Sequence, residues 1–158
     1  MGQELNHLLS QIDPVTFREL VNVFEDTQCR WFFTGQGRSG LVAQMAAMRF
    51  MHLGRTVHVV GDATAPSIRQ GDGMVIVSGS GETPVGVGFG RIARAEQARL
   101  VLLTHKPRST LAGIADIVLP VSVAGTVQFG GSLFEQASLL LLDAVVLLLM
   151  RRLPDANA

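Results

Sequence analysis

Residues 31–40 read WFFTGQGRSG, and this stretch decides the fold. Trp31–Thr34 is a short apolar run, which is typical of a strand buried on both faces. Glycines follow at once in Gly35–Gly40, and residues from about 39 to 53 then have the apolar spacing of a helix. Gly54 supplies the left-handed residue that commonly follows the end of a helix. The stretch therefore predicts a buried strand, a glycine loop and a helix, in that order.

The same alternation continues along the chain. Further strands are predicted at residues 56–60, 74–78, 100–104 and 117–121, and further helices at 83–97, near 109–114 and from about 132. Strands that alternate with helices of this length pair in parallel, through right-handed crossovers. We therefore predict an α/β fold with a doubly wound, five-stranded parallel sheet flanked by helices, of the flavodoxin-like kind.

Residues 1–29 precede this alternation and are predicted to be a helical segment. Asp13-Pro14 has the form of a helix start, because Asp caps free amides and Pro needs no amide donor there. The α/β core is placed at residues 30–153, and no linker or low-complexity tract interrupts it. We therefore predict a single domain over residues 1–158.

The composition argues against several classes of protein. The 158 residues are 47% hydrophobic and 16% charged, with 13 basic and 13 acidic side chains. A nucleic-acid groove or a polybasic membrane surface needs a surplus of Lys and Arg, so we expect neither partner. The single cysteine, Cys29, allows no intrachain disulfide, and the first residues lack the pattern of a signal peptide. We therefore expect a cytoplasmic protein.

The most apolar segment, residues 137–150, is about fourteen residues long and contains Asp143. A membrane span needs about twenty apolar residues. We therefore interpret the segment as a helix buried in the core or against another subunit, and we expect no membrane contact. Its apolar circumference exceeds what one sheet face can cover, which favours a homo-oligomer.

Two loops combine glycines with hydroxyl side chains, and each lies between a predicted strand and a predicted helix. They are TGQGRSG at residues 34–40 and SGSGET at residues 78–83. In a parallel sheet the loops at the carboxyl ends of the strands share an edge, where ligands bind. Glycines let a ligand approach the backbone, and helix N-termini favour anions. The two loops therefore predict a phosphate cradle.

Two other interpretations of these loops stay open. Gly35-x-Gly37-x-x-Gly40 is also the dinucleotide-binding fingerprint, and Asp62 follows it at about the required distance. That interpretation leaves residues 78–83 unexplained, and the chain is too short to supply a dehydrogenase with a substrate domain. Alternatively, the loops are tight turns with Ser or Thr helix caps and bind no ligand.

Taken together, the two loops resemble those of the sugar isomerase (SIS) domain superfamily. Three further segments resemble its 6-phospho-3-hexuloisomerase family: AMRFMHLG at residues 47–54, VVGDATAP at 59–66 and GSLFE at 131–135. The resemblance extends from about Trp31 to Leu153. It implies the SIS fold and a homotetramer built as a dimer of dimers.

The resemblance also implies a reaction, the conversion of D-arabino-hex-3-ulose 6-phosphate to fructose 6-phosphate in the ribulose monophosphate pathway of formaldehyde fixation. The carbonyl moves from carbon 3 to carbon 2 through a 2,3-enediolate, so the site needs a phosphate grip, a base and oxyanion donors. No cofactor is expected, and the scattered histidines show no metal-ligand spacing. A non-catalytic sugar-phosphate-binding SIS module, or an isomerase of another sugar phosphate, stays an open alternative.

The phosphate is assigned to Ser78, Ser80 and Thr83, with Gly37 and Ser39 of the first loop. The resemblance supports the four hydroxyl residues, and a combination of hydroxyls and free amides suits a phosphate.

Two arginines are further candidates for binding the substrate. Arg38 and Arg49 are each expected to pair with the phosphate or with Glu82, or to form an ordinary surface salt bridge. The charge of Glu82 would repel a phosphate, so we expect this side chain to face a basic residue or solvent.

Glu135 is the predicted catalytic base, by analogy with SIS isomerases. The alternative is that Ser132-Leu-Phe-Glu135 forms a capping box, in which Glu135 only bonds to the cap amide. His52 is the second catalytic candidate, as the imidazole that opens the sugar ring or shuttles a proton. Its alternative role is to stabilise a helix C-terminus. Because His52 is predicted far from its own glycine loop, a catalytic His52 has to serve a neighbouring subunit.

Overall fold

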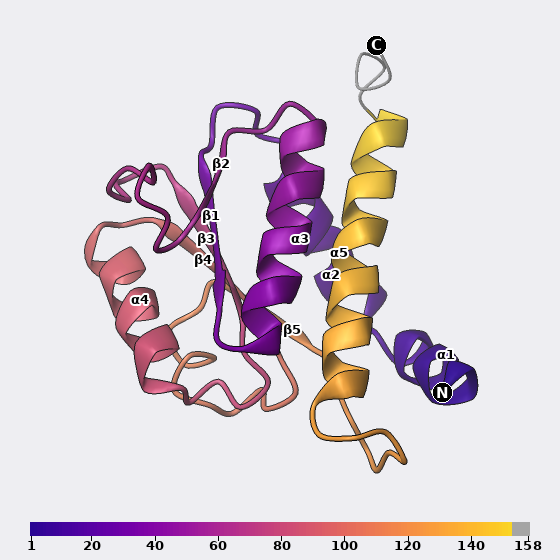
Figure 1. The fold of residues 1–158 in the computed structure, drawn as a ribbon. Helices are drawn as coiled ribbons and strands as arrows, with labels where there is room; N and C mark the ends of the chain where they lie inside the picture. Colours follow the sequence, from indigo (N-terminus) through magenta and orange to yellow (C-terminus); the bar gives the residue numbers. More distant parts are fainter. Residues whose placement is uncertain (153–158) are drawn as a thin grey trace.

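The computed structural model describes residues 1–152, which form a five-stranded sheet flanked by helices (Figure 1). The strands are β1 (Trp31–Gly35), β2 (Val57–Val59), β3 (Gly73–Val77), β4 (Arg99–Thr104) and β5 (Ile117–Pro120). The helices are α1 (Gly2–Ser10), α2 (Pro14–Val23), α3 (Arg38–His52), α4 (Pro84–Ala95) and α5 (Ser132–Arg152). All strand pairs are parallel, in the order β2-β1-β3-β4-β5, which confirms the predicted doubly wound fold. The predicted end of the core at Leu153 lies outside the described residues.

The register of the sheet places the two glycine loops side by side. β1 and β3 are neighbours, and Gly35, the last residue of β1, is level with Val77, the last residue of β3. The loops that follow these strands therefore start next to each other at the carboxyl edge of the sheet.

Alternate residues of the strands enter two separate cores. Trp31 and Phe33 of β1 belong to the larger core, which includes the buried residues of α2, α3 and α5. Phe32, between them, belongs to the smaller core beneath α4. Figure 1 shows α4 on one face of the sheet and α3 and α5 on the other. Because both faces are covered, the strands carry continuous apolar runs.

The local signals for helix ends are confirmed. The Asp13 Oδ2 atom accepts a hydrogen bond from the Thr16 amide at 2.8 Å, so Asp13 caps α2, and Pro14 is the first residue of that helix. Gly54 has a φ of +77° just beyond α3. These two ends are set by short-range chemistry, which explains why the sequence predicts them.

The predicted short helix near residues 109–114 is wrong, because this segment forms a series of turns. The Gly113 and Ala115 amides donate to carbonyls four residues earlier, but the Ile114 amide between them donates to Leu111, only three residues earlier. The consecutive hydrogen bonds of an α-helix therefore do not form.

Helix α5 has 21 residues, and by length and composition it is long and apolar enough to cross a membrane. Half of its most apolar window is buried inside the protein. The helix is longer than the apolar segment at residues 137–150, since it includes the polar residues at both ends of that segment. Leu140 and Leu147 point away from the core and stay exposed.

Candidate active site

Three helices begin at the edge where the strands end. Figure 1 shows the first turns of α3, α4 and α5 at this carboxyl edge of the sheet. Residues 35–40 lead into α3, and residues 78–83 lead into α4. The first amides of a helix have no partner within the helix, so this edge can supply N–H donors to an anion.

The first loop brings the start of α3 against the end of β1. A Cβ atom on Gly35 would lie 2.7 Å from the carbonyl carbon of Ser39, and one on Gly40 would lie 2.7 Å from the carbonyl oxygen of Gly35. Only glycine permits this approach. Gly37 precedes the helix with a φ of +57° and open space around it, and no side chain caps the helix. The amides of Gly40 and Leu41 donate to the carbonyl oxygen of Gly37, whereas those of Arg38 and Ser39 have no partner among residues 1–152 and are left for a ligand.

The second loop contains the three predicted phosphate-binding hydroxyls. The hydroxyl oxygen of Ser78, which is buried, accepts the Gly81 amide at 3.1 Å, and that of Ser80 accepts the Glu82 amide at 3.2 Å. Each hydroxyl keeps its hydrogen for another acceptor. Thr83 is the cap residue of α4, but its side chain makes no cap hydrogen bond. The side chains of these loops therefore do not cap α3 or α4 in the structure.

The second loop is fastened to the segment that follows β4. The carbonyl oxygen of Gly79 accepts hydrogen bonds from the Thr104 hydroxyl at 2.9 Å and from the His105 amide at 3.2 Å. The carbonyl oxygen of Gly81 accepts the Leu111 amide. The loop is thus held in one conformation before any ligand arrives.

Glu82 is exposed, as expected, and its carboxylate bonds to the segment that follows β4. Its Oε1 atom accepts the Thr110 amide at 2.7 Å. Hydrogen bonds from Thr110 lower the pKa of the Glu82 carboxyl, and the nearby charge of Lys106 adds to this effect. The negative charge of Glu82 is therefore engaged by the segment after β4.

Arg38 pairs with Glu135, and not with Glu82. The Nε–H of Arg38, in the first turn of α3, donates to Oε2 of Glu135, in the first turn of α5. The side chain of Arg38 is 67% exposed, whereas that of Glu135 is only 13% exposed. The pair therefore places a largely buried carboxylate at the edge where the glycine loops end.

The hydrogen bonds at the start of α5 are not those of a capping box. The Ser132 hydroxyl donates to the carbonyl oxygen of Phe129 at 2.7 Å, and Ser132 lies within the helix. The carboxylate of Glu135 bonds to Arg38. The hydrogen bonds that would make Glu135 a capping residue are therefore not present in the described structure. Its carboxylate is available for chemistry.

His52 and Arg49 lie in the last turn of α3, at the opposite end from the glycine loops. The helix has 15 residues, so this end is about 20 Å from its start. Both side chains are exposed. Within one subunit, the structure brings neither residue to the edge that holds Glu135 and the second loop.

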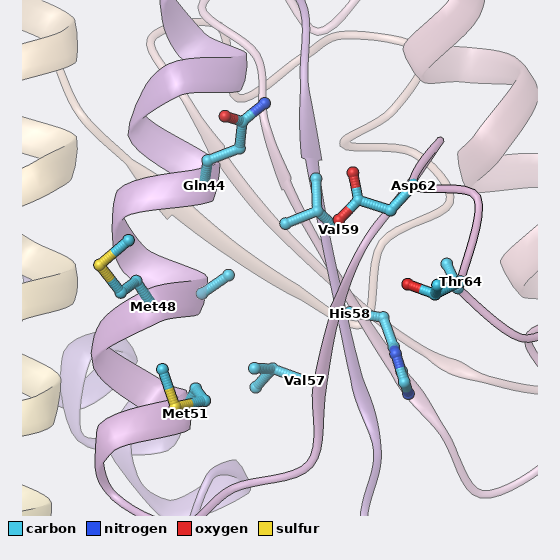
Figure 2. Close-up of a pocket in the computed structure, with 10 residues that line it drawn as sticks. Gln44, Met48, Met51, Val57, His58, Val59, Asp62 and Thr64 are labelled. Carbon is cyan, nitrogen blue, oxygen red and sulfur yellow. The ribbon is translucent and has the colours of Figure 1, made fainter.

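A separate pocket of about 380 Å³ lies between α3, β2 and the segment after β2 (Figure 2). Gln44, Met48 and Met51 line it from α3, and Asp62 and Thr64 line it from the segment after β2. No residue assigned to the substrate lines this pocket. Asp62, the acid of the dinucleotide fingerprint, therefore belongs to a different hollow from the site proposed for the phosphate.

One neighbour of the second loop was not assigned a function from the sequence. His105 follows β4, and its ring lies against Gly79. The only signal in the sequence is its position just after a predicted strand, which many structural residues share.

Among residues 1–152, no three His, Cys, Asp or Glu side chains gather as a metal-binding group.

The chain belongs to the SIS domain family, whose model matches residues 26–148. A 3-hexulose-6-phosphate isomerase of Mycobacterium gastri is 45% identical over 124 residues, which cover 73% of this chain and 62% of that enzyme. The chain thus spans less than two thirds of that relative. The Bacillus subtilis protein of the same name is 38% identical over 130 residues, or 77% of this chain and 70% of that protein.

A solved structure supports the same family. It is the crystal structure of a hypothetical protein of Methanococcus jannaschii, from which a molecular function of 3-hexulose-6-phosphate isomerase was inferred. The two chains superpose with a TM-score of 0.88 at 26% identity, over 97% of this chain and 88% of the other. The SIS fold expected from the glycine loops is therefore confirmed.

Proposed function

We propose that this chain is a 3-hexulose-6-phosphate isomerase, which interconverts D-arabino-hex-3-ulose 6-phosphate and fructose 6-phosphate. One observation carries the proposal: the two glycine loops and the carboxylate of Glu135 lie at the same edge of the sheet. The relatives that bear this name support the choice of sugar.

The proposed phosphate grip is made of hydroxyl hydrogens and helix N-terminal amides that have no other acceptor among residues 1–152. The hydroxyls of Ser78, Ser80 and Thr83 and the uncapped amides of α3 and α4 surround the same edge. Gly37 and Ser39 add the amides of the first loop. A dianion placed there gains hydrogen bonds and the favourable field of two helix N-termini.

Proton transfer is assigned to Glu135. Its carboxylate takes the proton from carbon 2 of the hexulose, and the electrons form a 2,3-enediolate. The hydroxyl proton then moves from the carbon-2 oxygen to the carbon-3 oxygen, and Glu135 returns its proton to carbon 3, which leaves the carbonyl at carbon 2. Arg38 orients the carboxylate through its Nε–H. Removing much of the carboxylate from water strengthens its interactions inside the site.

The test of this function is a coupled assay. Formaldehyde and ribulose 5-phosphate are condensed to hexulose phosphate by a synthase, this protein is added, and fructose 6-phosphate is measured. Formation of fructose 6-phosphate only when the protein is present is the expected result. Saturable binding of fructose 6-phosphate without conversion would instead support the non-catalytic SIS module. That alternative has some support, because an uncharacterised HTH-type transcriptional regulator of Thermotoga maritima is 28% identical over 155 residues.

Replacing Thr83 with Val is expected to raise the KM for the sugar phosphate about tenfold, because one hydrogen bond to a charged group is lost. The melting temperature should stay the same, since the Thr83 side chain makes no cap bond. Steady-state kinetics give the KM, and a thermal melt gives the melting temperature. Thr83→Ser, which keeps the hydroxyl, is the control. A fall in stability with an unchanged KM would show that Thr83 acts as a cap.

We also propose a homo-oligomer, as a tetramer built from dimers. Leu41, Met45, Met48 and Met51 form an exposed apolar row along α3, and Leu140 and Leu147 are exposed on α5. Exposed apolar patches of this kind mark interaction surfaces. Analytical ultracentrifugation tests the assembly, and a stable monomer at micromolar concentration would oppose it.

His52 is proposed to complete the site of a neighbouring subunit. His52→Asn and Glu135→Gln variants should each be inactive alone, since each removes a different catalytic group. When the two chains are coexpressed and assort at random, about a quarter of the wild-type activity should return, because mixed pairs hold one intact site. An active His52→Asn variant, or a mixture without activity, would contradict the shared site.

A further inference from the structure

His105 lies against the second glycine loop and next to the start of α5. A Cβ atom on Gly79, in the middle of the second loop, would lie 3.2 Å from Cδ2 of His105 and 3.5 Å from Cδ1 of Phe134. The rings of His105 and Phe134 meet edge to face, with centroids 6.1 Å apart. Phe134 precedes Glu135 at the start of α5. The imidazole therefore packs against the phosphate loop, beside the first turn of the helix that carries the proposed base.

The backbone of His105 is fixed, whereas its ring is available. Its amide donates to the carbonyl oxygen of Gly79, and the preceding residue, Thr104, is fully buried and donates to the same oxygen. The side chain of His105 is exposed, and neither ring nitrogen has a hydrogen-bond partner among residues 1–152. A ring held at a set place with free nitrogens is suited to bind a ligand.

The charge around His105 suits an anionic substrate. Lys106 and Arg108 follow it in the same turn, and both are exposed. Lys106 is close enough to lower the pKa of the Glu82 carboxyl. In a chain with 13 basic and 13 acidic side chains, this segment places a local cluster of basic groups beside the phosphate loop.

We propose that His105 is a substrate-contacting residue, whose ring N–H donates to an oxygen on the carbon chain of the sugar phosphate. This inference rests on the proposed function. With the phosphate at Ser78–Thr83 and the reacting carbons at Glu135, the carbon chain begins beside the imidazole, because the ring lies against Gly79 of the phosphate loop. His105 therefore distinguishes a sugar phosphate from a bare phosphate, which the glycine loops alone do not do.

The experiment compares the sugar phosphate with inorganic phosphate. His105→Leu should lower kcat/KM for the hexulose phosphate at least about tenfold, as expected for a lost substrate hydrogen bond. The inhibition constant of inorganic phosphate and the melting temperature should stay at wild-type values. His105→Gln, which restores a donor, should recover part of the loss. His58→Gln replaces a histidine on β2, outside both loops, and serves as the matched control.

Two results would overturn the inference. One is a kcat/KM for His105→Leu within about threefold of wild type in a protein that melts normally. The other is an equal loss of affinity for inorganic phosphate, which would mean that His105 contacts the phosphate group and not the sugar. If the wild-type protein proves inactive, the proposed function fails separately. Calorimetric binding of fructose 6-phosphate and inorganic phosphate to the same variants then still tests the contact.

Discussion

Replacing Glu135 with Gln is expected to lower kcat about a thousandfold, within the range that a single general base contributes. The amide has the shape of the carboxylate and accepts a hydrogen bond from Arg38, but it cannot take the proton from carbon 2. Binding should survive, because the phosphate is held by the glycine loops. Steady-state kinetics give kcat, and calorimetry with fructose 6-phosphate gives the dissociation constant.

The control for this substitution is Glu19→Gln. Glu19 is an exposed glutamate on α2, outside the site, and its replacement should leave both kcat and binding unchanged. If Glu135→Gln retains turnover within a few-fold of wild type, Glu135 is not the base. A joint loss of turnover and binding would mean that Glu135 and its contact with Arg38 mainly hold the site together.

Replacing Gly81 with Ala is expected to destabilise the protein by about 2–4 kcal/mol and to impair phosphate binding. Gly81 has a φ of +65°, which disfavours any side chain. A Cβ atom there would lie 2.5 Å from Cβ of the buried Ser109 and closer still to its hydroxyl oxygen. The second loop would have to move away from residues 104–111. Chemical denaturation and the inhibition constant of inorganic phosphate measure the two effects.

Gly54→Ala is the matched control for this substitution. Gly54 also has a positive φ, of +77°, but nothing lies within 4 Å of an added Cβ. The free energy of unfolding of this variant should therefore fall by only about 1 kcal/mol, from the unfavourable backbone conformation, and its affinity for phosphate should not change. Combining Gly81→Ala with Ser109→Gly removes the clash and should restore part of the stability. Equal losses in Gly54→Ala and Gly81→Ala would show that the contact with Ser109 is unimportant.

The strands were predictable because their signal is local. Each is a run of apolar residues bounded by glycine or polar residues, and burial on both faces leaves no alternation to interpret. The segment near residues 109–114 shows the limit of such signals. Its local pattern favours a helix, but the Leu111 amide bonds to Gly81, thirty positions earlier in the chain. A propensity of a few tenths of a kcal/mol per residue does not decide the conformation of so short a segment.

The sequence by itself determined the alternation of strands and helices, the two glycine loops and the identity of the hydroxyls within them. These follow from backbone conformation and apolar periodicity, which act over a few residues. Only the tertiary structure paired Arg38 with Glu135, 97 positions apart, and set His105 beside Gly79. Such contacts depend on which strands are neighbours and on how α3 and α5 pack, because the order of strands in a sheet is decided by the packing of the whole chain.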